Sequence, residues 1–432
     1  MTAIHEDAAR PVRTDLSASS PGGPTNLDAG STRRKYAPHQ RRHLLMVLTA
    51  STAMMAGASA PTPFYPRIQA DLGFTPFVTT CVFAVYAATL LATVLATGSL
   101  AGHLNRRPVI STGFLILSIG IMLFSHADTA AELIAARSVQ GVATGLLLSA
   151  LPALVVDIGS ARPSGSATAS TWNSITTMGG LAVGAFSAAI VLDRTEDSAP
   201  TIVFTVFTAL YLLAAVAIWT VPETAAHHPR IQKSLRPRIT LPPGVSAPYL
   251  RGAPAVVAGW ATGGLYLSLG PAIVVSHFRT GSHAVASLGL VLLASSGAVA
   301  CFVLRHRTPR FASIFGTSAL SVGTIWALIA LTRDSEWMYF SAVIVAGTGY
   351  GTAFSGVLRS ITPLTRPADR AGVLAAVYAL SYTAFGLPVV ISGLLIPRLG
   401  LNVVTYWYGG IVAGLSILAA ILRWRAPIPT PG

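Results

Sequence analysis

Long apolar stretches separated by short polar connections are the feature that most constrains this chain. A helix that crosses a bilayer needs about 20 mostly apolar residues. Only 10% of the 432 residues are charged, too few to cover the surface of a soluble protein of this size. The sequence therefore predicts an all-α polytopic membrane protein with twelve transmembrane helices. The predicted spans are 43–61, 76–100, 108–126, 131–156, 166–192, 200–221, 252–276, 283–304, 311–332, 337–360, 370–396 and 401–422.

The placement of lysine and arginine predicts the orientation. With the N-terminus inside, 23 of the 29 basic residues fall on the cytoplasmic side, five fall outside and Arg137 lies within the membrane. Cytoplasmic loops collect basic residues, so both termini are expected in the cytoplasm. We expect a multi-pass protein of the cell inner (plasma) membrane. The same rule explains the net charge of +14 without a nucleic-acid partner.

The longest connection between predicted spans divides the chain into two halves. Residues 1–43 are polar and are expected to form a disordered cytoplasmic tail. Two six-helix bundles are expected at 44–221 and 252–424, joined by a proline-rich cytoplasmic loop at 222–251. Residues 425–432 form the predicted cytoplasmic C-terminal tail.

A weak internal repeat relates the two halves. When the chain is shifted by 206 residues, "GVATGLLLSA" (141–150) aligns with "GTGYGTAFSG" (347–356). The register continues without a gap, and it places Trp172 on Tyr378 and Gly180 on Gly386. We therefore expect pseudo-twofold symmetry between the bundles. Arg137 aligns with Val343, so its charge belongs to one half only.

Four motifs resemble those of the major facilitator superfamily, in its bacterial, drug-efflux-like members. The stretch "GSLAGHLNRRPV" (98–109) matches the family's loop signature at Gly98, Arg106 and Arg107, although Gly102 stands where an acid is usual. The stretch "RSVQGVATG" (137–145) matches the span-four signature. "GGLAVGAFSA" (179–188) partly resembles the efflux signature, with Ala185 in place of its proline, and "ASAPTPFYPRIQADLG" (58–73) also looks like bacterial members.

The resemblance implies a transport mechanism. Two bundles would rock about a central site and open it to each side in turn. Spans one, four, seven and ten would line the cavity, so Arg137 would face water rather than lipid. The loop signature would touch the cytoplasmic end of span eleven and close the inner gate.

Arg137, Gln140 and Thr144 are the leading candidates for substrate binding. They are spaced at i, i+3 and i+7, which places them on one face of a helix. A charge at the centre of a membrane helix costs about 2.5–3.5 kcal/mol by insertion scales, so it needs compensation or a function. We expect Arg137 to bind an anionic or strongly polar group of the substrate, or to act as a gate residue. The alternative is that Arg137 extends to the lipid headgroups.

Aromatic and amide side chains in several spans suit an amphipathic small molecule. For each aromatic residue the alternative is packing or a place in the membrane-interface belt. The candidates are Trp172 and Asn173 in span five, Trp260 and Tyr266 in span seven, Tyr350 in span ten and Tyr378 in span eleven.

Gly98, Arg106 and Arg107 are the expected inner gate. Without an acid in their own loop, the arginines need a partner, and we expect Asp369 or Asp157 to pair with one of them in the outward-open state. For Asp369 the alternative is a simple helix cap. Gly180 and Gly184 follow a small-xxx-small spacing that favours close helix packing.

The sequence supplies no clear relay for protons. None of the 15 acidic residues lies mid-span, and Asp71 and Glu132, at outer ends, are the nearest candidates. Proton coupling therefore rests on family analogy. There is no Walker-type loop, and we expect no cofactor, no metal site and no enzyme activity.

We expect a secondary active transporter that exports small, partly apolar molecules, drugs or metabolites, as an antiporter if protons drive it. Uptake of a small organic anion through Arg137 is one alternative. A non-transporting receptor or scaffold with the same fold is another. The expected partners are a small-molecule substrate, the lipid bilayer and, if coupling holds, protons; the chain is expected to be a monomer.

Overall fold

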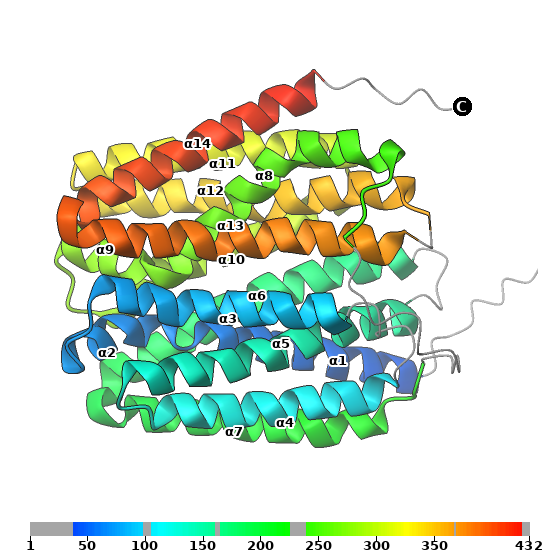
Figure 1. The fold of residues 1–432 in the computed structure, drawn as a ribbon, viewed down its shortest axis with the longest axis horizontal. Helices are drawn as coiled ribbons and strands as arrows, with labels where there is room; N and C mark the ends of the chain where they lie inside the picture. The colour runs from blue at the N-terminus through cyan, green and yellow to red at the C-terminus, as the bar shows by residue number, and fades with distance from the viewer. Residues whose placement is uncertain (1–37, 98–104, 160–164, 225–238, 367–368, 426–432) are drawn as a thin grey trace, which may run out of the picture.

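The regular structure is helical throughout the part of the chain that the computed structural model describes, residues 38–97, 105–159, 165–224, 239–366 and 369–425. The long helices run side by side along the longest axis of the molecule (Figure 1). The first helix begins, and the last ends, toward the same end of this array. Gly98, most of the two predicted tails and the middle of the predicted central loop lie outside the described residues.

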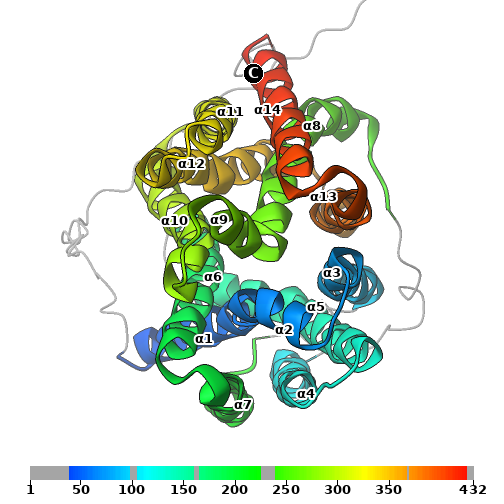
Figure 2. The ribbon, with the colours of Figure 1, turned by 90° about the vertical axis from the view of Figure 1, so that its left-hand side faces the viewer.

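Helices of the first half of the chain gather on one side and those of the second half on the other, as the end-on view in Figure 2 shows. The first group comprises α1 (Pro38–Ser59), α2 (Tyr65–Asp71), α3 (Pro76–Thr97), α4 (Arg106–Ser125), α5 (Ala130–Gly159), α6 (Gly165–Thr195) and α7 (Ala199–Ala217). The second comprises α8 (Pro243–Ser268), α9 (Gly270–Phe278), α10 (His283–Val303), α11 (Pro309–Thr332), α12 (Glu336–Ile361), α13 (Arg370–Leu399) and α14 (Leu401–Trp424).

The prediction of twelve spans is met only in part. Among the described residues, ten segments are long and apolar enough to cross a membrane, or eleven if the bent pair α8 and α9 is one span. One of the ten, Thr171–Thr220, contains most of α6 and all of α7, because only the short 3-10 turn Glu196–Ser198 separates these helices. The seventh predicted span also begins earlier than expected, at Pro243.

Two helices break near the end of the molecule opposite the start of α1 and the end of α14. We call this the outer end and the opposite one the inner end, after the orientation predicted from the sequence. Between α1 and α2 lies the 3-10 turn Thr62–Phe64, in a tract where prolines remove backbone donors. Between α8 and α9 the axis bends by 62° at Leu269, ahead of a Gly–Pro pair. A shift of 206 residues places Thr62–Phe64 on Ser268–Gly270, so the two breaks coincide in the repeat.

Small residues allow helices of each half to approach closely. A Cβ added at Gly180 would lie 2.6 Å from the Met55 Cβ of α1, and one at Gly184 would overlap the Ala56 backbone. Gly141 of α5 meets α3 at the Tyr86 carbonyl, and its repeat partner Gly347 of α12 meets α10 in the equivalent way. Larger side chains at these positions would force the helices apart.

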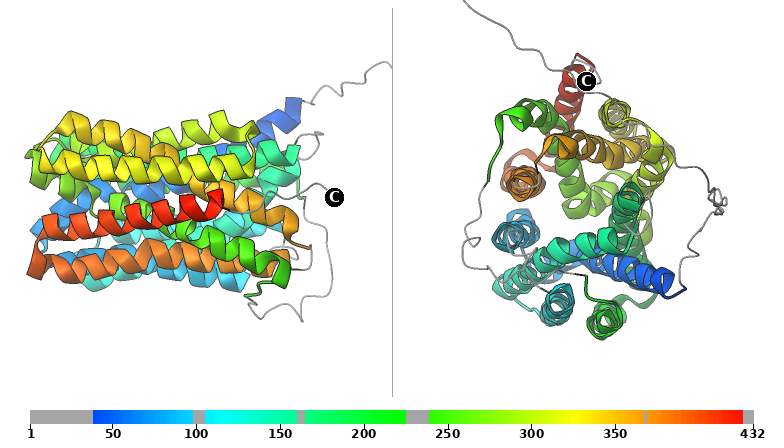
Figure 3. Two further views of the ribbon diagram at one scale, coloured as in Figure 1. Left: turned by 90° about the horizontal axis from the view of Figure 1, so that it is seen from above. Right: turned by 90° about the vertical axis from the view of Figure 1, so that its right-hand side faces the viewer.

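In the described part of the chain, the two halves meet mainly along two helix pairs. α3 of the first half packs against α13 of the second, and α6 packs against α10. Figure 2 and the further views in Figure 3 show these pairs on opposite sides of the molecular centre. A site that opens between the halves would therefore lie between these pairs.

Candidate functional site

Arg137 lies inside the first half and is only 1% exposed. Its Nη1 donates to Gln140 Oε1 at 2.7 Å, and its Nη2 donates to the Tyr65 hydroxyl at 2.6 Å. The guanidinium carbon lies 4.9 Å from the centre of the Tyr86 ring. Gln140 in turn donates its amide N–H to the Gly120 carbonyl of α4 at 3.0 Å. Elements α2, α3, α4 and α5 thus converge on one cation.

Within the described residues, Arg137 forms no ion pair with a carboxylate, so a hydroxyl, an amide and aromatic faces compensate its charge. Its Nε is buried, and no described residue accepts a hydrogen bond from it. The side chain does not extend to the headgroups. Nor does it face a wet cavity in this conformation, as the resemblance had implied, because packing closes around it.

Thr144, the third residue on the predicted face, is fully buried and its hydroxyl donates to the Gln140 carbonyl within α5. Tyr65 is a partner that was not predicted from the sequence. The break after α1 turns Tyr65 inward, so the proline-rich tract 58–73 was the available signal.

Aromatic residues of α8, α12, α13 and α3 form a cluster at the boundary between the halves. The Trp260 ring centre lies 4.8 Å from that of Tyr382 and 5.8 Å from that of Phe385. Phe385 continues across the boundary to Phe83 of α3, at 4.9 Å. We call this set the boundary aromatic cluster; its members are Phe83, Trp260, Tyr350, Phe354, Tyr378, Tyr382 and Phe385.

The structure brings three predicted residues, Trp260, Tyr350 and Tyr378, into or against this cluster. Tyr378 lies 6.3 Å from Tyr382, ring centre to ring centre. The Tyr350 ring covers Gly263, one turn beyond Trp260 on α8. All three predicted residues are half-buried, so part of each side chain is accessible. Partly open aromatic faces and phenol hydroxyls suit a substrate that is itself partly apolar.

Helix α3 connects this cluster to Arg137. Phe83 and Tyr86 are one turn apart on α3, where Phe83 packs on Phe385 and Tyr86 lies beneath the guanidinium of Arg137. A shift of α3 relative to α13 would therefore disturb both features together.

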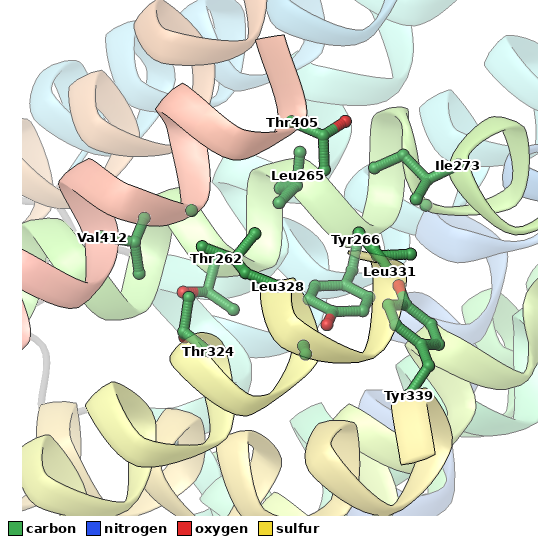
Figure 4. Close-up of a pocket in the computed structure, with 13 residues that line it drawn as sticks. Thr262, Leu265, Tyr266, Ile273, Thr324, Leu328, Leu331, Tyr339, Thr405 and Val412 are labelled. Atoms are coloured by element: carbon green, nitrogen blue, oxygen red, sulfur yellow. The ribbon is translucent and has the colours of Figure 1, made fainter. Parts of the chain in front are cut away.

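Tyr266 lies apart from the boundary aromatic cluster. It lines a cavity of about 30 Å³ inside the second half, between α8, α9, α11, α12 and α14. Figure 4 shows Tyr266 and Tyr339 side by side at this cavity. Such a volume holds water but not an organic substrate. Trp172, which is 39% exposed, and Asn173 lie toward the inner end of α6, and the structure does not bring them into the cluster.

At the inner end of the first half, Arg106 meets Asp157 of α5. Arg106 Nη1 lies 2.7 Å from Asp157 Oδ2. The backbone N–H groups of Arg106 and Arg107 each donate to the Glu223 carboxylate at 3.1 Å. Glu223 therefore caps α4, a role that was not predicted from the sequence. Asp369 instead pairs with Arg366, only three residues away.

At the outer end, Asp193 of α6 joins the first half to the start of α10. Its carboxylate accepts hydrogen bonds from the Ser282 hydroxyl at 2.7 Å, the His283 N–H at 2.6 Å and the Ala284 N–H at 3.0 Å. We call this the outer contact. The sequence places Asp193 near the outer surface without indicating a role, because a cap supplied by another helix leaves no local signal.

Comparison with known families gives a match to the model described as "Major Facilitator Superfamily", over residues 47–357. Among curated proteins, the chain is 35% identical over 80 residues to the multidrug resistance protein MdtL of Escherichia coli O45:K1 (strain S88). It is 31% identical over 80 residues to the protein of that name from Klebsiella pneumoniae subsp. pneumoniae. Each match covers 18% of this chain and 20% of the relative, so the chain spans about a fifth of the length of these relatives.

Two solved structures share the arrangement of helices. The human organic anion transporter MFSD10 (TETRAN) matches with a TM-score of 0.64 and 14% identity, over 89% of this chain and all of that one. A point mutant of the nucleoside transporter NupG matches with a TM-score of 0.65 and 14% identity, over 88% of this chain and 99% of that one. At this identity, the likeness concerns the fold.

Proposed function

The chain belongs to the Major Facilitator Superfamily and is a multi-pass membrane transporter, and from this premise we propose that it exports small, partly apolar organic molecules by alternating access. The proposed substrate class rests on the boundary aromatic cluster, whose side chains are partly accessible, and on the buried Arg137 guanidinium that α3 connects to it. The direction is supported by the partial similarity to multidrug resistance proteins. We place the chain in the plasma membrane as a monomer, with both termini cytoplasmic.

We propose twelve spans in two pseudo-symmetric six-helix bundles. Counting α6 and α7 separately, and α8 with α9 as one broken span, supports this number. The coincident breaks and the equivalent packing of Gly141 and Gly347 support the symmetry. The bundles correspond to residues 44–221 and 252–424, with cytoplasmic segments before, between and after them.

The conformation described here is, in our proposal, closed toward the outside. The outer contact joins the halves at one end, and Met178 of α6 lies against Gly297 of α10 midway along the pair. Trp172, nearer the inner end of α6, is exposed instead. The inner end would close in the opposite state, and Arg106, Arg107, Asp157 and Asp369 remain the proposed gate residues. The Arg106–Asp157 pair was predicted for the outward-open state, but it is already formed within the first half in this conformation. Glu223 fixes the start of α4.

Uptake or exchange of an organic anion is a second candidate function. A specific observation favours it: the hydrogen-bond partners of Arg137 in the described chain are neutral groups, so its positive charge is not cancelled by a neighbouring acid. An anionic group entering from the cavity could interact with that charge once the packing around Arg137 opens.

Flux through purified protein in proteoliposomes tests these proposals. We expect transport of an aromatic dye such as ethidium, abolished in Trp260→Ala and largely retained in Trp260→Phe, because phenylalanine preserves an edge-to-face contact with Tyr382. An imposed pH gradient tests coupling. Preferred transport of benzoate over ethidium would select the anion function. The absence of flux for every compound in a folded sample would favour the receptor or scaffold alternative.

A further inference from the structure

Arginines crowd the inner end of the second half, where α10, α11, α12 and α14 come together. We call them the inner arginine cluster: Arg305, Arg307, Arg310, Arg359 and Arg423. Hydrogen bonds link arginine side chains of the cluster to the backbone of neighbouring segments that carry the other arginines. Arg310 Nη2 donates to the Trp424 carbonyl at 2.7 Å, and Arg359 Nη2 donates to the Arg307 carbonyl at 2.8 Å.

The cluster carries positive charge without an acidic neighbour in the described part of the second half. Between residues 239 and 425 the sequence has three acids, and two of them, Asp334 and Glu336, lie at the outer end. The third, Asp369, is paired with Arg366. The cluster's side chains donate to backbone carbonyls and to the Ser360 hydroxyl, all neutral groups. In the first half, by contrast, the Asp157 carboxylate pairs with Arg106, and the Glu223 carboxylate accepts a hydrogen bond from the start of α4.

Two buried guanidinium nitrogens of the cluster have no acceptor in the described chain, which favours an anionic ligand. Arg423 is 8% exposed, and its Nε has no hydrogen-bond partner within the described chain. Arg310 Nη1 is likewise buried without one. Because a buried N–H without an acceptor costs free energy, such groups favour an incoming acceptor, most of all a negatively charged one.

Exposed apolar side chains adjoin the cluster on the same helices. Phe302 is 44% exposed and lies under the Arg305 guanidinium, whose carbon is 3.9 Å from the ring centre. Phe311 is 47% exposed with Arg307 above it, and Trp424 is 72% exposed. A soluble anion would leave these apolar faces uncovered, whereas a lipid would cover them with its acyl chains.

We propose that the inner arginine cluster is a binding site for an anionic phospholipid, with the phosphodiester against the guanidiniums and the acyl chains against Phe302 and Phe311. The site uses no residue of the boundary aromatic cluster. It therefore depends on membrane residence and not on the transported substrate.

Trp424 gives a direct probe of this site. The protein is reconstituted in phosphatidylcholine vesicles that contain either brominated phosphatidylglycerol or brominated phosphatidylcholine, and fluorescence quenching is measured. The signal of Trp424 is the difference between the wild type and Trp424→Phe. We expect quenching at Trp424 to show a several-fold preference for phosphatidylglycerol, reduced about fivefold in Arg307→Gln, since a surface arginine contributes about that factor.

Arg307 is exposed, so its substitution should leave the fold intact. Arg307→Lys keeps the charge and should keep most of the preference. Arg333→Gln, which removes an exposed arginine at the outer end, is the matched control and should have no effect. The proposal is overturned by equal quenching from both lipids, by a preference that survives in Arg305→Gln/Arg307→Gln, or by competition from inorganic phosphate, which would indicate a site for a soluble anion.

Discussion

The outer contact makes a quantitative prediction about the balance between outward-closed and outward-open states. Asp193 accepts hydrogen bonds from the first two N–H groups of α10 and from the Ser282 hydroxyl. Asp193→Asn removes the negative charge from the positive end of the helix and replaces one accepting oxygen with a donor. Loss of such a cap costs about 1 kcal/mol at an exposed site. The odds of the outward-open state should therefore rise about fivefold.

Electron-spin distance measurements report these odds directly. Cys81 and Cys301 are first replaced, and spin labels are attached at Asp128→Cys and Arg333→Cys, two exposed positions at the outer ends of opposite halves. The longer-distance population should grow in Asp193→Asn. The matched control is Asp197→Asn, because Asp197 lies in the following turn but pairs with Arg67 of its own half. An unchanged distribution in Asp193→Asn, or an equal change in the control, would refute the reasoning.

Three further predictions concern the first half and its packing. Arg137→Leu should abolish flux while leaving folded protein, because it removes the charge that Tyr65 and Tyr86 accommodate; intact flux would remove Arg137 from the mechanism. Glu223→Gln should lower the melting temperature by about 2 °C by weakening the cap on α4, as a thermal-shift assay would measure, and an unchanged value would exclude that role. Gly184→Val should reduce the yield of folded monomer in size-exclusion chromatography, because the added side chain would overlap the Ala56 backbone. Gly414→Ala, where the added Cβ meets open space, should not reduce it. Equal yields would contradict the close packing at Gly184.

Local periodicity explains why part of the site could be predicted. Arg137 and Gln140 are one turn apart, so helical geometry alone predicts that they share a face, and the structure joins them by a hydrogen bond. The partner Tyr65 is 72 residues away. Tyr65 turns inward because the chain breaks between α1 and α2. The prolines of this tract indicate that a helix breaks there, but they do not indicate which way the next side chain points.

The aromatic candidates show the same limit. Trp260 and Tyr266 lie in one predicted span, yet Trp260 makes edge-to-face aromatic contacts at the boundary and Tyr266 lines a cavity within the second half. The two are six residues apart, which places them on different faces of α8. Which face meets the other half depends on how α8 packs against α12 and α13, and no pattern within the span specifies this.

The span count depended on a different property. Hydropathy separated the stretches 166–192 and 200–221, but it registers neither bends such as the one at Leu269 nor the contacts that residues at helix ends make with the other half. Asp193 illustrates the consequence. It lies where a helix ends beside the other half, and its value as a cap follows from a contact 90 residues away in the chain.

The central claim is that one site at the boundary aromatic cluster opens to each side of the membrane in turn. Tyr350→Cys in a cysteine-free background can be labelled with a membrane-impermeant maleimide in right-side-out and inside-out vesicles. The account predicts labelling mainly from the inner side, with outer-side labelling rising about fivefold when Asp193→Asn is added. Labelling from only one side in both backgrounds, or from neither, would contradict it.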